Sequence, residues 1–149
     1  KKTGGGVLLD LSHELDYIQW IAGIIKVKHV YSEKISNLEI DTDDILMLNA
    51  QTSNGAKIHI GLNYFTRKPI RKIIIDGEGI SIQADLITSS MNINKDEKNK
   101  YFSWKEVNRN YTYSAQHQAI TDNNFSDICS FSEGLTTMKL IESIKGKVS

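Results

Sequence analysis

The stretch DDILMLNAQTSNGAKIHIGLNYFT, residues 43–66, decides the fold class of this chain. It contains two runs with strand character on either side of Asn54-Gly55, the strongest short-range signal for a β-hairpin that a sequence offers. Side chains alternate between two faces of a strand. In the second run one face carries Ile58, Ile60, Leu62 and Tyr64, and the other carries His59, Gly61, Asn63 and Phe65. The stretch therefore predicts two antiparallel strands.

The neighbouring segments extend this pattern in both directions. Residues 24–35 alternate and are rich in β-branched residues, and residues 70–86 form a second pair of runs that turns at Asp76–Gly79. Residues 91–104 suggest two shorter, more exposed strands around a charged loop at 95–100. Connections this short force antiparallel pairing, because a parallel pair needs a long crossover. We therefore expect one open, mainly antiparallel sheet of roughly five to seven strands.

Helical segments lie on both sides of these strands in the sequence. Residues 7–22 show helical periodicity and end at Gly23, residues 111–122 show it weakly, and residues 131–146 follow a capping box of Ser130 and Glu133. On the first helix the shared apolar face consists of Leu8, Leu11, Leu15, Ile18 and Ala22. The order helix, strands, helices predicts an α+β fold with the helices on one face of the sheet.

Composition limits the classes of function. The 149 residues suit a single domain, residues 1–149, and the formal net charge of zero does not favour nucleic acid or an anionic membrane as a partner. Cys129 is the one cysteine, so the chain has no internal disulfide and a reducing, cytoplasmic location is expected. No apolar run is long enough to cross a membrane. The chain starts without methionine, so we expect it to be a segment of a longer protein.

The polar face of the first helix is the main candidate site. Asp10, His13, Tyr17 and Trp20 fall together on it, with Asp16 at its edge, and Gly4–Gly6 precede the helix. An imidazole titrates near neutral pH and suits proton transfer, and a neighbouring carboxylate would orient it. Asp10 and Asp16 each lie one turn from His13 and either is placed to do this. The alternative is a solvated helix face with no function.

Other chemistries find less support. The run His13-Glu14-Leu15-Asp16 lacks the second histidine of a zinc helix motif, so no metal is predicted. Cys129 has no partner histidine signal, and Gly4–Gly6 do not follow a strand as a dinucleotide fingerprint requires. Arg67 and Arg71 flank Pro69 and would suit an anionic substrate group or a solvated edge.

Three segments, in order, resemble one known family. They are GGGVLLDLSHELDYIQWIAG at 4–23, IDTDDILMLNAQTSNGAKIHIGLNYFTRKPIRKIIIDGEGISIQADL at 40–86, and SFSEGLTTMKLIESI at 130–144. The first is similar to the opening helix of the C-terminal domain of Gfo/Idh/MocA oxidoreductases, which include glucose–fructose oxidoreductase and inositol dehydrogenase. The second is similar to the family's strands from an Asp-Thr-x-Asp start onward, and the third to its closing helix. The resemblance covers nearly the whole chain.

The resemblance implies a substrate-binding and oligomerisation domain. An N-terminal Rossmann domain of the same parent protein would bind NAD or NADP and supply a catalytic lysine, so the fragment alone is expected to be inactive. The implied reaction is reversible hydride transfer between the nicotinamide and a carbon bearing a hydroxyl, on a sugar or cyclitol. His13 would be the acid–base residue and Asp10 the carboxylate near the substrate, with Asp16, Tyr17, Arg67 and Arg71 as further substrate-binding residues.

Two other readings of the chain stay open at this point. One is a non-catalytic protein that uses the open sheet for assembly. The other is a small ligand-binding α+β domain with an enclosed pocket inside the sheet.

Overall fold

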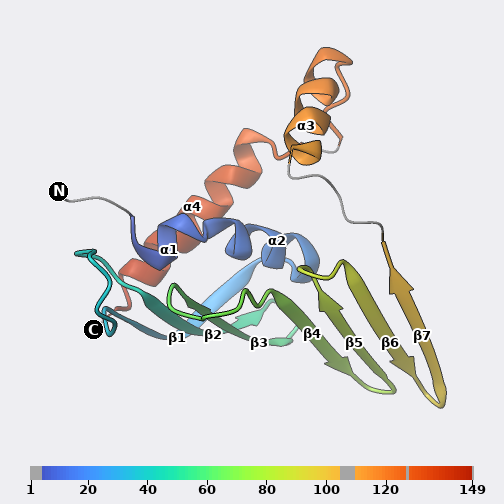
Figure 1. The fold of residues 1–149 in the computed structure, drawn as a ribbon, viewed down its shortest axis with the longest axis horizontal. Helices are drawn as coiled ribbons and strands as arrows, with labels where there is room; N and C mark the ends of the chain where they lie inside the picture. The colour runs from blue at the N-terminus through green and yellow to red at the C-terminus, as the bar shows by residue number, and fades with distance from the viewer. Residues whose placement is uncertain (1–4, 105–109, 127, 149) are drawn as a thin grey trace. The chain divides into compact units, whose positions relative to one another are not determined.

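The computed structural model describes residues 5–104, 110–126 and 128–148. The chain divides into two compact units, Lys1–Phe65 with Ile128–Ser149, and Thr66–Asp127. Figure 1 labels the helices and strands of both units. Each unit contains its own hydrogen-bonded sheet, of three strands in the first and four in the second.

The sheet of the first unit is built around the predicted hairpin. Strands β1 (Ile25–Glu33), β2 (Ile45–Thr52) and β3 (Lys57–Asn63) pair in the order β1-β2-β3, and both pairings are antiparallel. Gly55 has a φ of 94° in the turn, a conformation that glycine adopts without steric cost. The hairpin prediction at Asn54-Gly55 is confirmed.

Three helices cover one face of this sheet (Figure 1). They are α1 (Gly6–Asp10), α2 (Ser12–Ala22) and α4 (Phe131–Lys145). The core between helices and sheet consists of Val7, Leu8, Leu15, Ile25, Val27, Leu46, Leu48, Ala50, Ile60, Leu140, Ile141 and Ile144. This face of β2 and β3 is the apolar one, as the alternation in the hairpin predicted, and the opposite face carries exposed residues such as Met47 and His59.

The expected single helix over 7–22 is two helices that meet at Leu11, whose backbone (φ −104°, ψ 23°) leaves the helical region. Each part is bonded to a different partner. The Leu8 N–H donates to Asp43 beside β2, whereas Asp16 accepts a hydrogen bond from Thr137 of α4. The helix axis therefore changes between Asp10 and His13, and the two side chains do not belong to one continuous helix face.

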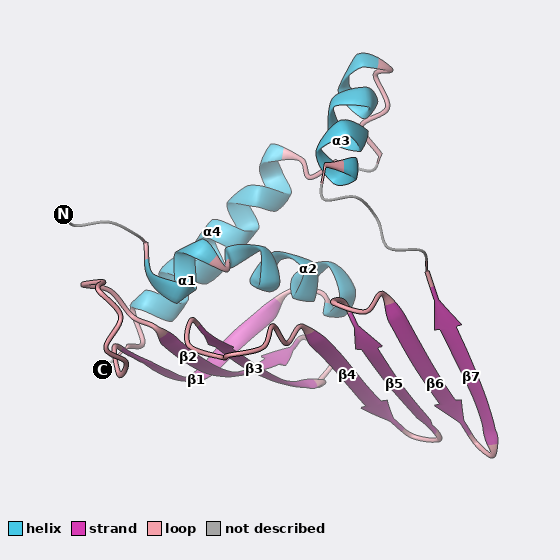
Figure 2. Ribbon diagram, viewed as in Figure 1, coloured by secondary structure: helices cyan, strands magenta, loops and turns pink. Residues whose placement is uncertain are grey.

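The second unit contains β4 (Lys72–Gly77), β5 (Ile80–Asp85), β6 (Ser90–Lys95), β7 (Lys98–Ser103) and α3 (Tyr111–Thr121). The strands form an antiparallel sheet in chain order (Figure 2). Directly paired residues share a face of a sheet. One face therefore carries two apolar rows, Ile73, Ala84, Met91 and Phe102 in the first and Ile75, Ile82 and Ile93 in the second.

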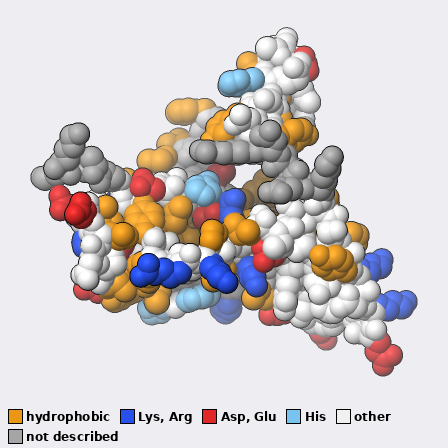
Figure 3. Space-filling model, viewed as in Figure 1, with side chains coloured by type: hydrophobic (Ala, Val, Ile, Leu, Met, Phe, Trp, Pro, Cys, Tyr) orange, Lys and Arg blue, Asp and Glu red, His pale blue; other side chains and the backbone are white. Residues whose placement is uncertain are grey.

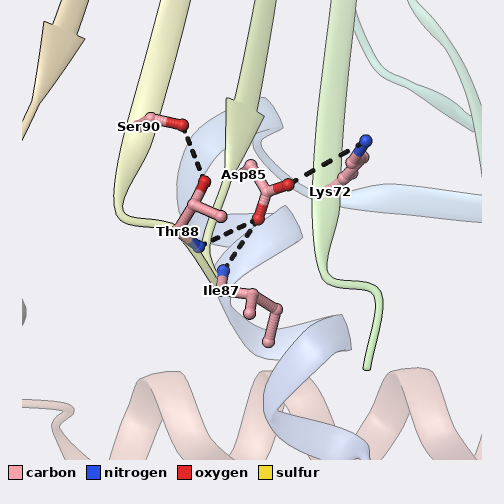
Figure 4. A network of polar contacts seen from close by, with 5 residues as sticks. All are labelled: Lys72, Asp85, Ile87, Thr88 and Ser90. Carbon is pink, nitrogen blue, oxygen red and sulfur yellow. Dashed lines mark hydrogen bonds and ion pairs between the residues drawn. The ribbon is translucent and has the colours of Figure 1, made fainter. Parts of the chain in front are cut away.

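Asp85 organises the turn between β5 and β6 (Figure 4). Its Oδ1 accepts hydrogen bonds from the backbone N–H groups of Ile87 (3.0 Å) and Thr88 (3.1 Å), and Lys72 Nζ lies 3.9 Å from Oδ2. The Thr88 and Ser90 hydroxyls are 2.8 Å apart beside it. The backbone N–H of Thr88, then that of Ile87 and the Lys72 ammonium, hold the pKa of Asp85 below its ordinary value. The turn is thus stabilised by an ionised carboxylate.

The structure confirms the α+β class, the seven strands and their antiparallel pairing. The expected single sheet is instead two sheets, because β3 and β4 do not pair. Residues 64–71 between these strands include Pro69, which has no N–H to donate to a ladder. The weak helix at 111–122 and the capped helix at 131–146 are both present as predicted.

Large hydrophobic side chains remain at the surface of both units (Figure 3). In the first unit Trp20 is 83% exposed and Phe131 is 88% exposed. In the second, Ile74 and Tyr101 are exposed on one face of the sheet, while Ile75 and Phe102 are partly exposed on the other.

Candidate functional site

Gly6, the first residue of α1, leaves room for an aspartate side chain. Gly6 has a φ of 77°, and a Cβ on it would lie 2.0 Å from Asp43 Oδ1. Asp43 accepts hydrogen bonds from the Val7 N–H at its backbone oxygen (3.0 Å) and from the Leu8 N–H at Oδ2 (3.1 Å). At Gly6, then, the space left by the absent Cβ is filled by the Asp43 carboxylate of this chain.

The same contacts bear on cofactor binding. A dinucleotide pyrophosphate binds the free backbone N–H groups of a helix N-terminus. At α1 the Val7 and Leu8 N–H groups already bond to Asp43, whose negative charge would repel a phosphate. The start of α1 therefore does not fit a dinucleotide.

Asp10 ends α1 and is oriented by the sheet. The Tyr64 hydroxyl, directly after β3, donates a 2.6 Å hydrogen bond to Asp10 Oδ2. Burial, then the hydrogen bond to Asp10 and the negative charges of Asp10 and Asp43, raise the pKa of Tyr64 above its ordinary value. Tyr64 therefore keeps its proton and remains a hydrogen-bond donor to Asp10 throughout the neutral pH range.

His13 lies in the first turn of α2, with its side chain 56% exposed to solvent. Its Nε2 is 3.1 Å from Oε1 of Glu14, which is buried at 8% exposure. The Tyr17 hydroxyl, one turn further along α2, donates to the other carboxylate oxygen of Glu14. An exposed imidazole thus lies beside a buried carboxylate, and that carboxylate accepts a hydrogen bond from a tyrosine.

Asp16 is used to join two helices. The Thr137 hydroxyl of α4 donates a 2.6 Å hydrogen bond to Asp16 Oδ1, and Gln19 Nε2 donates to Thr137 Oγ1 at 3.2 Å. Thr137 is buried, so this small network closes the contact between α2 and α4. The carboxylate at His13 is therefore Glu14, in place of the expected Asp10 or Asp16.

A hollow of the first unit lies beside Asp43 and has a volume of about 400 Å³. Gly5, Leu8, Thr42, Asp43 and Lys145 are among its lining residues, and His13 is not. His13 is accordingly open to the surface of the unit. Among the described residues no group of three or more His, Cys, Asp and Glu side chains is placed to hold a metal ion.

Comparison with known proteins identifies the family. The model of the oxidoreductase family's C-terminal alpha/beta domain, Gfo/Idh/MocA, matches residues 1–149. The chain is a Gfo/Idh/MocA C-terminal domain. The resemblance of the three segments is thereby confirmed. No curated protein matches this domain.

Solved structures share the fold of this Gfo/Idh/MocA domain. UDP-N-acetylglucosamine 3-dehydrogenase GnnA from Acidithiobacillus ferrooxidans matches with a TM-score of 0.77 and 14% identity, over 95% of this chain and 46% of that one. The 3-ketoreductase KijD10 from Actinomadura kijaniata, in complex with NADP and TDP-benzene, matches with a TM-score of 0.77 and 12% identity, over 97% and 46%. The domain thus spans about half the length of these proteins.

The structure brings some of the predicted site residues of the Gfo/Idh/MocA domain into one unit. Asp10, His13, Asp16 and Tyr17 all belong to α1 and α2 of the first unit, whereas Arg67 and Arg71 belong to the second. Arg67 is exposed and Arg71 is half-buried.

No helix of the described residues is both long and apolar enough to cross a bilayer.

Sequence reasoning missed two residues of this arrangement. Tyr64 belongs to the inward-facing set of the hairpin alternation, and its position next to the helices follows from that pattern. Glu14 has a weaker signal in the sequence, where it is one residue of the run His13–Asp16. Glu14 is distinguished by its burial on α2. The periodicity of an amphipathic helix does not predict that one particular glutamate will be buried.

Proposed function

We propose that this Gfo/Idh/MocA domain provides the substrate and proton-transfer side of an NAD(P)-dependent oxidoreductase that acts on a hydroxyl of a sugar or cyclitol. The observation that carries the proposal is the exposed His13, whose Nε2 lies 3.1 Å from Glu14 Oε1, together with the Tyr64-bonded Asp10 at the end of the preceding helix. Family membership gives the reaction class, and the names of GnnA and KijD10 are consistent with sugar-linked substrates.

The nicotinamide cofactor would come from an N-terminal Rossmann domain of the same parent protein, which supplies the hydride acceptor when NAD or NADP is bound there. The occupied N–H groups at α1 favour this division over binding by the present domain. The domain by itself is accordingly proposed to be inactive. We also propose that residues 1–149 act as one domain, and the family match over these residues supports this.

His13 would take the proton of the substrate hydroxyl while the carbon that bears this hydroxyl loses a hydride to the nicotinamide. The products are then a ketone, the reduced cofactor and a proton on the imidazole, which passes to water. In the reverse direction the imidazolium returns the proton to the carbonyl oxygen. Asp10 Oδ1 would accept a hydrogen bond from a neighbouring hydroxyl, because Tyr64 holds the carboxylate at Oδ2.

The other predicted site residues receive more limited roles. We assign Asp16 to the α2–α4 contact and Tyr17 to the support of Glu14, so neither needs to touch substrate. Arg67 and Arg71 remain candidates for binding an anionic group of the substrate. We also propose a cytoplasmic location, because a chain with a single cysteine forms no internal disulfide and suits a reducing compartment.

His13→Ala in the full-length protein tests the proposal. Loss of an acid–base group lowers kcat by about 100-fold or more, with a small effect on KM. Turnover is followed by absorbance of the reduced cofactor on a panel of sugars, nucleotide sugars and cyclitols. His117→Ala, on the exposed surface of α3, is the matched control and should retain activity. Full activity of His13→Ala with every substrate would contradict the assignment and favour a non-catalytic assembly protein.

A further inference from the structure

We propose that the outer face of the three-stranded sheet in the first unit binds a diphosphate-class anion, a small molecule that carries two linked phosphate groups. The outer face is the one opposite α1, α2 and α4 (Figure 1). The inference does not depend on the proposed oxidoreductase function. It gives a role to His29 and His59, which the proposed reaction does not use.

A hollow of about 350 Å³ lies over this face. The residues that line it are Lys28, His29, Asn49, Ala50, Gln51, Lys57, Ile58 and His59. Its ionisable lining side chains are therefore two lysines and two histidines, and no Asp or Glu is among the described residues that line it. The volume is in the range of small-molecule sites, and the charges are complementary to an anion.

The register of the strands brings these side chains together in rows. His29 pairs with Asn49 and Asn49 pairs with His59, so one row crosses all three strands on a single face. The next row consists of Lys26, Gln51 and Lys57. The two rows are about 7 Å apart on β2, the length of two residues along a strand. Two linked phosphate groups, together with the reach of a lysine side chain, span this distance.

A bulge in β1 adds a further cation. The register shifts between Val27 and His29, so Lys28 is an extra residue of β1 that has no paired residue on β2. Lys28 and His29 are both exposed, and both line the hollow. Bulges change the direction of a side chain and are common next to functional sites. The bulge thus places an ammonium group beside the histidine row.

The cations of this face are not neutralised within the described residues. The side chains without a hydrogen bond or ion pair to a described residue are those of Lys26, Lys28, His29 and Lys57. Further along β1 the same face carries Glu33, but its carboxylate accepts from the Tyr31 hydroxyl and does not line the hollow. An ammonium group has donors only, so the face favours a ligand rich in acceptors, such as phosphate oxygens.

The two histidines link anion binding to protonation. The Nδ1–H of His59 donates a 2.9 Å hydrogen bond to Asn49 Oδ1, because an amide oxygen can only accept. This bond leaves Nε2 as the nitrogen that takes up a proton. An imidazole gains a proton near pH 6.5, and a neighbouring anion stabilises the charged form. By linkage, a bound diphosphate makes both His29 and His59 easier to protonate.

Carbon-13 NMR of the histidine rings in the 149-residue chain tests this site without any measurement of activity. Inorganic pyrophosphate is titrated into the protein at low ionic strength. We expect saturable shifts of the His29 and His59 signals, and titration midpoints that rise by at least about half a pH unit when the ligand is bound. His117, exposed on α3, is the internal control and should not respond.

Lysine variants test which groups hold the anion. Lys28→Gln and Lys57→Gln should each weaken pyrophosphate binding at least about threefold, because each removes an ammonium group from the hollow. Lys139→Gln, the same change at an exposed position of α4, is the matched control and should retain full affinity. UDP distinguishes the sources of a diphosphate: equal affinity assigns recognition to the diphosphate group alone, and tighter binding adds the nucleoside.

Three results would overturn the inference. The first is the absence of saturable shifts at His29 and His59, or the same shifts with sodium chloride at equal ionic strength. The second is equal affinity of the two lysine variants and the unaltered chain. The third is histidine signals that change with protein concentration and not with pyrophosphate, which would assign this face to a second copy of the chain.

Each of these results leaves the acid–base role of His13 unaffected, and a failure of that role leaves the anion site unaffected. Thermal unfolding of each variant confirms that the comparison is made between folded proteins.

Discussion

At the scale of single residues, the carboxylates of the first unit divide into structural and reactive groups by what they touch. Asp43 and Asp44 are adjacent in the sequence, yet Asp43 bonds α1 and Asp44 bonds the loop after β1. Glu14 and Asp10 hold exposed or partly exposed groups at the candidate site. The bonding partners therefore separate these carboxylates: Asp43 and Asp44 accept from backbone N–H groups, whereas Glu14 and Asp10 accept from tyrosine hydroxyls.

Asp44→Asn should destabilise the chain. Asp44 is fully buried, and its carboxylate accepts from the backbone N–H groups of Ile35 and Ser36, each at 2.8 Å, and from the Ser36 hydroxyl. An amide nitrogen in place of Oδ2 would face two donors and leave them unpaired. We expect the melting temperature to fall by about 5 °C in thermal denaturation. Asp41→Asn, an exposed change in the same loop, should have little effect.

The same variant carries a pH signature. Burial opposes ionisation of Asp44, but the N–H donors of Ile35 and Ser36, with the Lys34 charge, hold its pKa below the ordinary value. A carboxylate with a lowered folded pKa stabilises fully above its unfolded pKa of about 3.9, and this contribution is lost as the pH falls through the folded pKa. The difference in melting temperature should be constant near neutral pH and shrink below about pH 4. An equal difference at pH 3 would contradict this account.

At the scale of elements, short-range signals are strong where a helix or turn is stabilised within its own residues. The cap of α4 is complete: Ser130 Oγ accepts from the Glu133 N–H at 3.2 Å, and the Glu133 carboxylate accepts from the Ser130 N–H at 2.7 Å. The first helix has no such cap at Leu11 and breaks there. Local capping therefore explains why the sequence predicts the helix at residues 131–145 more accurately than the two helices at residues 6–22.

Ser130→Ala should destabilise α4 by about 1 kcal/mol, the usual cost of losing a serine N-cap. The cap matters because α4 carries Leu140, Ile141 and Ile144 of the core. Chemical denaturation should show a lower midpoint with an unchanged dependence on denaturant concentration. Ser132→Ala, the same change two residues further along the exposed side of the helix, is the control. Equal effects from both variants would show that the cap contributes nothing specific.

At the scale of the whole molecule, we propose that the apolar face of the four-stranded sheet mediates oligomerisation. Its rows include Met91, Ile93 and the partly exposed Phe102. Closed symmetric homo-oligomers are the most common soluble assemblies, and a sheet face of this kind suits a self-complementary contact. The domain spans about half the length of GnnA and KijD10, so the proposed assembly is one of the parent protein.

Phe102→Glu tests this surface in the full-length protein. A charge in the centre of an apolar contact is costly to bury, so the variant should dissociate to monomers at concentrations where the unaltered protein is oligomeric. Analytical ultracentrifugation measures the change. Tyr101→Glu is the matched control, since Tyr101 lies on the opposite face of the same strand and is 66% exposed. Dissociation by Tyr101→Glu alone would assign the contact to the other face.

The sequence by itself determined the α+β class, the hairpin at Asn54-Gly55, the capped last helix and the family, because these depend on periodicity, turn residues and motifs that lie within short segments. The tertiary structure decided which carboxylate meets His13. Asp10 and Asp16 have the correct spacing on an ideal helix, but α1 is held by Asp43 and Tyr64 of the sheet side, and α2 by Thr137 of α4. These long-range contacts hold Asp10 at Oδ2 and Asp16 at Oδ1, and the carboxylate that lies 3.1 Å from the imidazole is the buried Glu14.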